Sequence, residues 1–135
     1  MYVFDTDSIS QLLRSRPPEA FIRRLARLPM EEAHITSITL GELYFGVYHA
    51  QHPKVALARL QERLLPKVKV LDFDGRAAER YGQVREGLSK AGRMIGHADC
   101  LIAAVVLVHG YVLVTGNVKE FRRVPSLRVE DWLRG

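Results

Sequence analysis

The sequence predicts an α/β fold: a three-layer α/β/α sandwich around a central, mainly parallel sheet of four or five strands. Three observations predict it. Short β-branched and aromatic runs alternate with segments of helical periodicity, which is typical of parallel sheets with helical crossovers. Residues 98–108 are apolar on nearly every side, as in a helix at the centre of a domain. With 135 residues, 47% of them hydrophobic, the chain can form a single domain over residues 1–135.

Five short runs have the composition of strands. They are residues 1–4 (MYVF), 34–38 (HITSI), 68–73 (VKVLDF), 111–114 (YVLV) and, more weakly, 127–129 (LRV). Helices are expected between them, because apolar residues recur there every three or four positions. These residues are Phe21, Leu25 and Leu28; Leu40, Leu43, Tyr44 and Val47; Leu57, Leu60 and Leu64; and Ala77, Tyr81, Val84 and Leu88, with a stop near Gly92.

The composition limits the classes of protein to which this chain can belong. The excess of Lys and Arg over Asp and Glu gives a net charge of +5, which is compatible with a phosphate-backbone partner. A single cysteine, Cys100, excludes an internal disulfide and fits a reducing compartment. The apolar run 101–108 is too short to span a bilayer, and Met1 leads directly into a strand rather than a signal peptide. We therefore expect a cytoplasmic protein with no membrane partner.

Polar side chains from four separate segments are expected at one edge of the sheet. Asp5 follows the first strand, and Thr115-Gly116-Asn117 follows the fourth. Glu42 lies early in the helix after the second strand, and Asp99 lies in the first turn of the buried helix. In parallel α/β sheets these positions all face the carboxyl ends of the strands, where ligands bind.

Each of these residues also has a purely structural interpretation. Asp99 could complement its helix dipole, and Glu42 could be a solvated helix residue beside an open space at Gly46. Asp7 is interpreted first as an N-cap and second as a neighbour of a ligand. Thr115 and Asn117 could end a strand and cap a short helix over 118–121. Taken together, however, carboxylates at one point repel each other and require a cation such as Mg²⁺ or Mn²⁺.

Two other classes use similar residues. A strand followed by DxD, with a Thr ending a later strand, also occurs in haloacid-dehalogenase-like phosphatases, in which Asp5 would be a nucleophile. Those enzymes need a later Lys and an acidic pair beyond another strand, and only 18 residues follow Asn117. A non-catalytic, receiver-like α/β module that binds nucleotides or proteins, with Asp72 or Asp74 as phosphoacceptor, stays open as an alternative.

The chain resembles PIN-domain proteins, specifically the small VapC-type toxins of prokaryotic toxin–antitoxin pairs. The resemblance runs from end to end, through VFDTD, ITLGELYFG, GRMIGHADCLIAA and LVTGNVKEFRRVPSLRVEDW. It implies a ribonuclease that depends on Mg²⁺ or Mn²⁺, with Asp5, Glu42 and Asp99 as acidic metal ligands. Asn117 stands at a fourth position that is often Asp. The supporting residues would be Thr115, Thr6 and Asp7.

The resemblance also implies partners. These are an RNA substrate, a cognate antitoxin whose Arg could pair with the carboxylates, and a second copy of the chain in a homodimer. Scattered arginines could neutralise an RNA backbone, although as a set they have the character of an ordinary solvated surface. They are Arg14, Arg16, Arg85, Arg93, Arg122 and Arg123.

Overall fold

Five strands form one parallel sheet in the computed structural model, which describes residues 1–133. The strands are β1 (Tyr2–Phe4), β2 (Ala33–Thr36), β3 (Lys69–Leu71), β4 (Val112–Val114) and β5 (Arg128–Glu130). Their order is β3-β2-β1-β4-β5, and every neighbouring pair is parallel. All five predicted strands are present, so the predicted parallel sheet is confirmed.

Helical segments connect the strands. They are α1 (Thr6–Ile9), η1 (Ser10–Leu13), α2 (Glu19–Ala26), η2 (Met30–Glu32), α3 (Ser37–His49), α4 (Pro53–Arg59), η3 (Leu60–Leu64), η4 (Leu65–Lys67), α5 (Gly75–Lys90), α6 (His97–His109) and α7 (Val118–Phe121). The apolar pattern around Leu57 and Leu64 predicted one helix. It forms α4 followed by the π turn η3 instead.

Local chemistry explains where the main helices begin and end. The Thr36 and Asp74 side chains cap α3 and α5 by accepting hydrogen bonds from the third residue of each helix. Asp74 is thus the N-cap of α5. Helix α6 ends at Gly110, whose φ of +67° is a left-handed conformation that glycine adopts at little cost.

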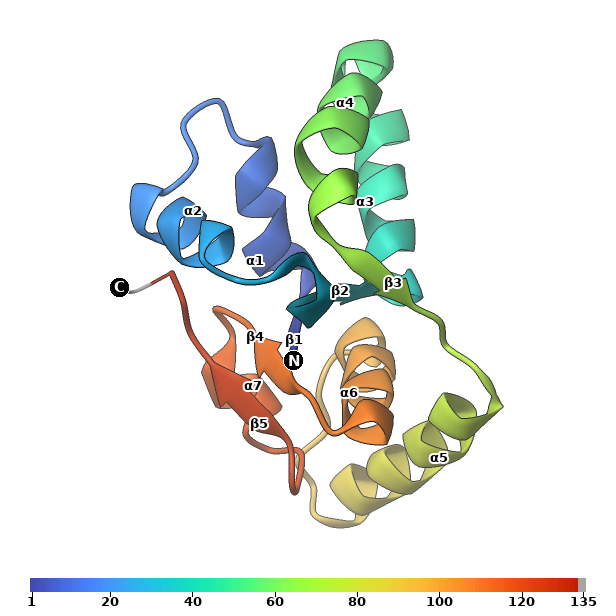
Figure 1. Cartoon of the computed structure of the whole chain (residues 1–135). Helices are drawn as coiled ribbons and strands as arrows, with labels where there is room; N and C mark the ends of the chain where they lie inside the picture. The colour runs from blue at the N-terminus through green and yellow to red at the C-terminus, as the bar shows by residue number, and fades with distance from the viewer. Residues whose placement is uncertain (134–135) are drawn as a thin grey trace.

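The sheet separates two apolar cores, which makes the architecture the predicted α/β/α sandwich (Figure 1). On one face, Phe4 and Val114 pack with residues of α1, α2 and α3. On the other face, Val3 and Leu113 pack with α5, α6 and α7. Cys100 and residues 102–106 of α6 are buried, so the predicted central helix is confirmed and Cys100 is a core residue.

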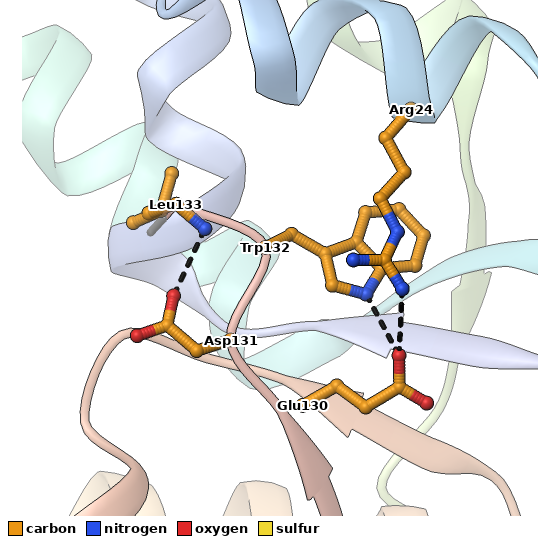
Figure 2. A network of polar contacts seen from close by, with 5 residues as sticks. All are labelled: Arg24, Glu130, Asp131, Trp132 and Leu133. Atoms are coloured by element: carbon orange, nitrogen blue, oxygen red, sulfur yellow. Dashed lines mark hydrogen bonds and ion pairs between the residues drawn. The ribbon is translucent and has the colours of Figure 1, made fainter. Parts of the chain in front are cut away.

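The end of the described chain is fixed to the first core. Trp132 is buried and packs edge-on against Tyr2 and Phe4. Its indole N–H donates to Glu130 Oε1, which also accepts from Arg24 of α2, both at 3.0 Å (Figure 2). The Arg24 guanidinium lies 4.3 Å from the centre of the indole ring. These contacts tie β5 to α2 and hold the outer edge of the sheet.

The topology places a ligand-binding position between β1 and β4. Crossovers from β1 run to β2 and β3, whereas the chain returns to the opposite side of β1 for β4 and β5. Parallel sheets bind ligands at such a reversal of strand order, beyond the carboxyl ends of the strands. Among residues 1–133, no helix has the length and apolarity needed to cross a membrane.

Candidate functional site

Asp5 lies where the strand order reverses, directly after β1. Its side chain is 4% exposed, and Oδ1 accepts the Ser8 backbone N–H at 3.0 Å, which makes Asp5 the N-cap of α1. Oδ2 accepts from the Thr115 hydroxyl at 2.5 Å, from the end of the neighbouring β4. Burial raises the pKa of Asp5, although the hydrogen bonds from Thr115 and Ser8 act in the opposite direction. The two strands thus hold one buried carboxyl between them.

Glu42 reaches the same edge from α3. Thr36 at the end of β2 caps α3 through the Thr39 N–H, so Glu42 comes in the second turn of the helix, close to the sheet. The Thr6 hydroxyl donates to Glu42 Oε1 at 2.5 Å and lies 3.2 Å from Thr39 Oγ1. Thr6 follows Asp5 in the chain, so the bond ties Glu42 to the segment that carries Asp5.

Asp99 comes from the first turn of α6. Its pKa is raised to about 6, first by burial and then by the negative charges of Glu120, Asp5, Glu42 and Asp7. Such charge interactions weaken with distance, so the carboxylates that act on Asp99 lie near it. The convergence that the sequence predicted for Asp5, Glu42 and Asp99 is therefore present.

Asn117 follows β4 and is bound on both sides. Its backbone N–H donates to Thr115 Oγ1 at 2.9 Å, and its Nδ2 donates to Glu120 Oε2 at 2.5 Å. Asn117 occupies the N-cap position of α7, but its side chain makes no capping hydrogen bond. The structural alternative is thus met in position only, because the amide binds the Glu120 side chain instead of a backbone N–H of α7.

The amino-acid sequence matches a known protein family over most of its length. Residues 2–127 match the PIN domain family. The chain belongs to the PIN domain family. It is 36% identical over 131 residues to a tRNA(fMet)-specific endonuclease VapC of Shigella flexneri, with 97% of each chain covered. Ribonuclease VapC2 of Haemophilus influenzae is 33% identical over 134 residues, with 98% of each chain covered.

Solved structures lead to the same family. VapBC2 of Rickettsia felis, bound to a DNA fragment from its promoter, superposes with a TM-score of 0.90 at 30% identity, covering 97% of this chain and 98% of that one. DNA-bound VapBC of Salmonella typhimurium gives a TM-score of 0.87 at 34% identity, with 97% of both chains covered. This PIN domain is thus a relative of the VapC ribonucleases over nearly its whole length.

Glu120 is the site residue that sequence reasoning missed in this PIN domain. It lies on α7, for which the sequence predicted only a short helix over 118–121. Its Oε1 accepts the Gly96 N–H at 2.7 Å, and this bond is the first cause of its lowered pKa. The signal that could have found it is its spacing, because Glu120 lies three residues after Asn117, on the same face of a helical turn.

Asp7 does not have the predicted capping role. Asp5 caps α1, and Asp7 lies exposed in the first turn of that helix. The backbone explains the difference: Asp5 has the extended conformation of an N-cap, with φ −73° and ψ 174°. The negative charge of Asp7 still contributes to the raised pKa values of Asp5 and Asp99.

Two further interpretations can be compared with the structure. A Cβ at Gly46 would meet no atom within 4 Å, so Gly46 is not required for tight helix packing and leaves the space beside Glu42 open. Asp74, a phosphoacceptor candidate in the receiver-like alternative, is engaged as the cap of α5. His97 lies next to Tyr81, with Nδ1 3.2 Å from the phenol oxygen.

Two of the three carboxylates, Asp5 and Glu42, accept hydrogen bonds from neighbouring residues. Within residues 1–133, no group of three or more His, Cys, Asp or Glu side chains is arranged to hold a metal ion as it stands. Thr115 and Ser8 donate to Asp5, and Thr6 donates to Glu42. The chemistry of the donors nevertheless fits a hard divalent cation, because all are carboxylate or amide oxygens, and a cation would offset the mutual repulsion of the carboxylates.

Proposed function

We propose that this protein is a metal-dependent ribonuclease and the toxin of a VapBC-type toxin–antitoxin pair. The observation that carries the proposal is the convergence of Asp5, Glu42 and Asp99 at the β1/β4 edge, where burial first, and then the negative charges of the neighbouring carboxylates, raise the pKa of Asp99 to about 6. Relatives named as ribonucleases, similar over nearly the whole chain, support the same activity.

Asp5, Glu42 and Asp99 would hold Mg²⁺ or Mn²⁺, with the Asn117 side-chain oxygen as a fourth donor. When bound, such an ion lowers the pKa of water and offsets the negative charge that develops on the phosphate. Glu42 is exposed, and its Oε1 accepts a hydrogen bond from the Thr6 hydroxyl, so binding an ion through this oxygen would require Glu42 to exchange that bond for the ion. The buried Asp5 is the fixed member of the set.

The remaining groups of the site position these donors. Thr115 donates to Asp5 Oδ2 and accepts from the Asn117 N–H, which links the two chain segments through one hydroxyl. Burial among apolar residues keeps Thr115 in place, since its side chain is fully buried. The chain as a whole carries a net charge of +5, which favours an approach by a polyanion such as RNA.

An antitoxin would bind in the groove beside Glu42. This groove has a volume of about 350 Å³ and is lined mainly by apolar side chains of η1, α3 and α4, with Glu42 and Thr6 at one end. Its lining is Thr6, Ser10, Leu13, Glu42, Leu43, Gly46, Val47, Ala56 and Arg59. An antitoxin segment with an apolar face and a terminal Arg would fill the groove and neutralise the carboxylates. The solved relatives described as VapBC complexes support such a partner.

A homodimer is the proposed state of the free protein. Phe45 and Tyr48 on α3 are 69% and 68% exposed, and large exposed aromatic side chains often mark contact surfaces. Light scattering coupled to size exclusion measures the mass directly. A mass near 15.3 kDa at micromolar concentration would contradict the dimer.

The decisive experiment for the activity is RNA cleavage. Purified protein is incubated with total RNA and Mg²⁺ or Mn²⁺, beside samples with EDTA and samples of the Asp99→Asn variant. We expect cleavage in the metal-containing samples and none in the two controls. Cleavage that persists in EDTA and in the variant would exclude the metal mechanism, and no cleavage of any RNA would favour a binding module without turnover.

A further inference from the structure

A cluster of aromatic and basic side chains lies where α5 meets the start of α6, outside the set of acidic residues. It consists of Tyr81 and Arg85 on α5 and His97, the first residue of α6. Arg85 Nη1 donates to the Tyr81 phenol oxygen at 2.5 Å, and the same oxygen lies 3.2 Å from His97 Nδ1. Because Arg85 supplies the proton of the first bond, the Tyr81 hydroxyl keeps its own proton and can donate it to His97. One phenol thus orients both the guanidinium and the imidazole.

The cluster lies at the same edge of the sheet as the acidic residues. Phe73 follows β3, and its backbone N–H donates at 3.0 Å to the hydroxyl of Ser37, the first residue of α3. The Tyr81 ring packs edge-on against Phe73, with 6.3 Å between the ring centres. Since Tyr81 also contacts the first residue of α6, the cluster lies between the starts of the two helices that carry Glu42 and Asp99.

The Arg85 guanidinium is exposed and has no acidic partner. Among residues 1–133 it forms no ion pair, and its hydrogen bond is the one to Tyr81. Burial raises the pKa of the Cys100 thiol while the charge of Arg85 acts in the opposite direction, so this charge lies near the start of α6. A guanidinium carries several N–H donors in a planar fork, and those that Tyr81 does not use can bind phosphate oxygens.

The His97 imidazole is an exposed ring of fixed orientation. It stands at 82° to the Tyr81 ring, with 5.7 Å between the ring centres. Such a ring is a surface on which a nucleobase can stack. Asp99 lies two residues further along α6, and two residues turn a helix by about 200°, so the two side chains leave the same helical turn in different directions. A nucleotide at His97 would therefore be the neighbour of the one at Asp99.

We propose that Arg85, Tyr81 and His97 form a subsite for the nucleotide next to the phosphodiester that is cut. Arg85 binds the phosphate of this nucleotide, the His97 ring stacks on its base, and Tyr81 is the positioning residue that holds both. An RNA strand that crosses the start of α6 contacts the acidic residues with one nucleotide and this subsite with the next. The subsite deepens the ribonuclease function proposed above and rests on it. An acidic peptide would use the guanidinium but not the exposed ring, so nucleic acid is the better match.

The test measures binding of a short fluorescent single-stranded RNA of mixed sequence to the full chain by fluorescence anisotropy, in EDTA so that metal-dependent cleavage is stopped. Arg85→Gln should weaken binding about tenfold, a usual cost of losing a hydrogen bond to a charged group. It should also reduce the slope of log affinity against log salt by about 0.7, the value for one phosphate contact on a single strand. His97→Ala should weaken binding about fivefold without changing this slope, because stacking releases no counterions, and His97→Phe should keep the affinity of the unchanged protein.

Arg76→Gln is the matched control. Arg76 is an exposed arginine of the same helix, and it lines a hollow with Leu107 and Val108 at the other end of α6. Its substitution changes the net charge by the same amount and should leave RNA binding unchanged. Equal weakening by Arg76→Gln and Arg85→Gln would show that only net charge matters, which overturns the phosphate contact.

The remaining outcomes separate the subsite from the proposed activity. A His97→Phe protein as weak as His97→Ala, or unchanged binding in both, would overturn the stacking role. Cleavage of total RNA with Mg²⁺ or Mn²⁺ is measured separately. Cleavage together with unchanged RNA binding in Arg85→Gln and His97→Ala would overturn the subsite alone. Binding that depends on Arg85 and His97 without any cleavage would refute the ribonuclease function and leave the RNA contact standing. Circular dichroism restricts the comparison to folded samples, and both side chains are exposed, so their substitution leaves the core intact.

Discussion

Replacing Asp99 with Asn should make the folded protein more stable at pH 7.5 while abolishing cleavage. In the folded chain the pKa of Asp99 rises from its ordinary value of 3.8 to about 6, through burial and four neighbouring carboxylates. Asn has nearly the same shape without the charge, and its amide can donate to Glu120. The substitution therefore removes repulsion and adds no cavity.

The size of the stability gain, and the pH range in which it appears, follow from the pKa of Asp99. A carboxyl that binds its proton more tightly when folded is a source of stability below pH 4, and this stability is lost as the pH rises from about 4 through about 6. The full pKa difference between the folded and unfolded states would correspond to roughly 3 kcal/mol in the free energy of unfolding. Because Asp99 is partly exposed, screening by water reduces the expected gain at pH 7.5 to about 1 kcal/mol.

Urea unfolding in EDTA at pH 4, 5.5 and 7.5 measures the effect. The D99N protein should match the unchanged protein at pH 4 and exceed it increasingly toward pH 7.5. Asp72→Asn, an exposed residue after β3, serves as the control and should show no such trend. A D99N protein that is equally destabilised at all three pH values would refute the reasoning, because Asp99 would then contribute favourable contacts rather than repulsion.

Three other perturbations have defined outcomes. Thr115→Val removes the donor to Asp5 and should lower the free energy of unfolding by about 2 kcal/mol. Thr115→Ser keeps the hydroxyl and should lose much less of this free energy. If urea unfolding shows the same loss for both variants, the hydroxyl is not the cause. Gly46→Leu should preserve RNA cleavage, because a side chain there meets open space, but should weaken inhibition by the cognate antitoxin in the same assay; full inhibition would argue against the groove. Trp132→Ala should cost about 3–5 kcal/mol in thermal unfolding, and a small change would show that the contacts in Figure 2 are dispensable.

The elements that sequence reasoning predicted correctly depend on short-range patterns. Alternating strand and helix periods, and acids placed directly after strands, were sufficient to expect the parallel sheet and the edge where Asp5 and Asp99 meet. The rule that carboxyl ends of parallel strands share one edge needs no coordinates. The role of these residues as metal ligands stays a prediction.

Asp7 and Glu120 show what the patterns could not decide. Both Asp5 and Asp7 precede helical residues, and only the backbone angles at the end of β1 assign the cap to Asp5. The spacing of Glu120 from Asn117 indicates a shared helical face, but its bond to the N–H of Gly96, 24 positions earlier, cannot be predicted from local spacing.

By itself, the sequence determined the fold class, the parallel order of elements and the set of acids brought to one edge, because these follow from periodicity and chain direction. Only the tertiary structure decided which donor each carboxylate binds. Side-chain partners depend on angles and distances between segments far apart in the chain, such as β4 and α7 around Asn117 or β1 and α3 around Thr6. That three-dimensional packing buries Asp5, leaves Glu42 exposed at the surface and places Glu120 in hydrogen-bond contact with Gly96 and Asn117.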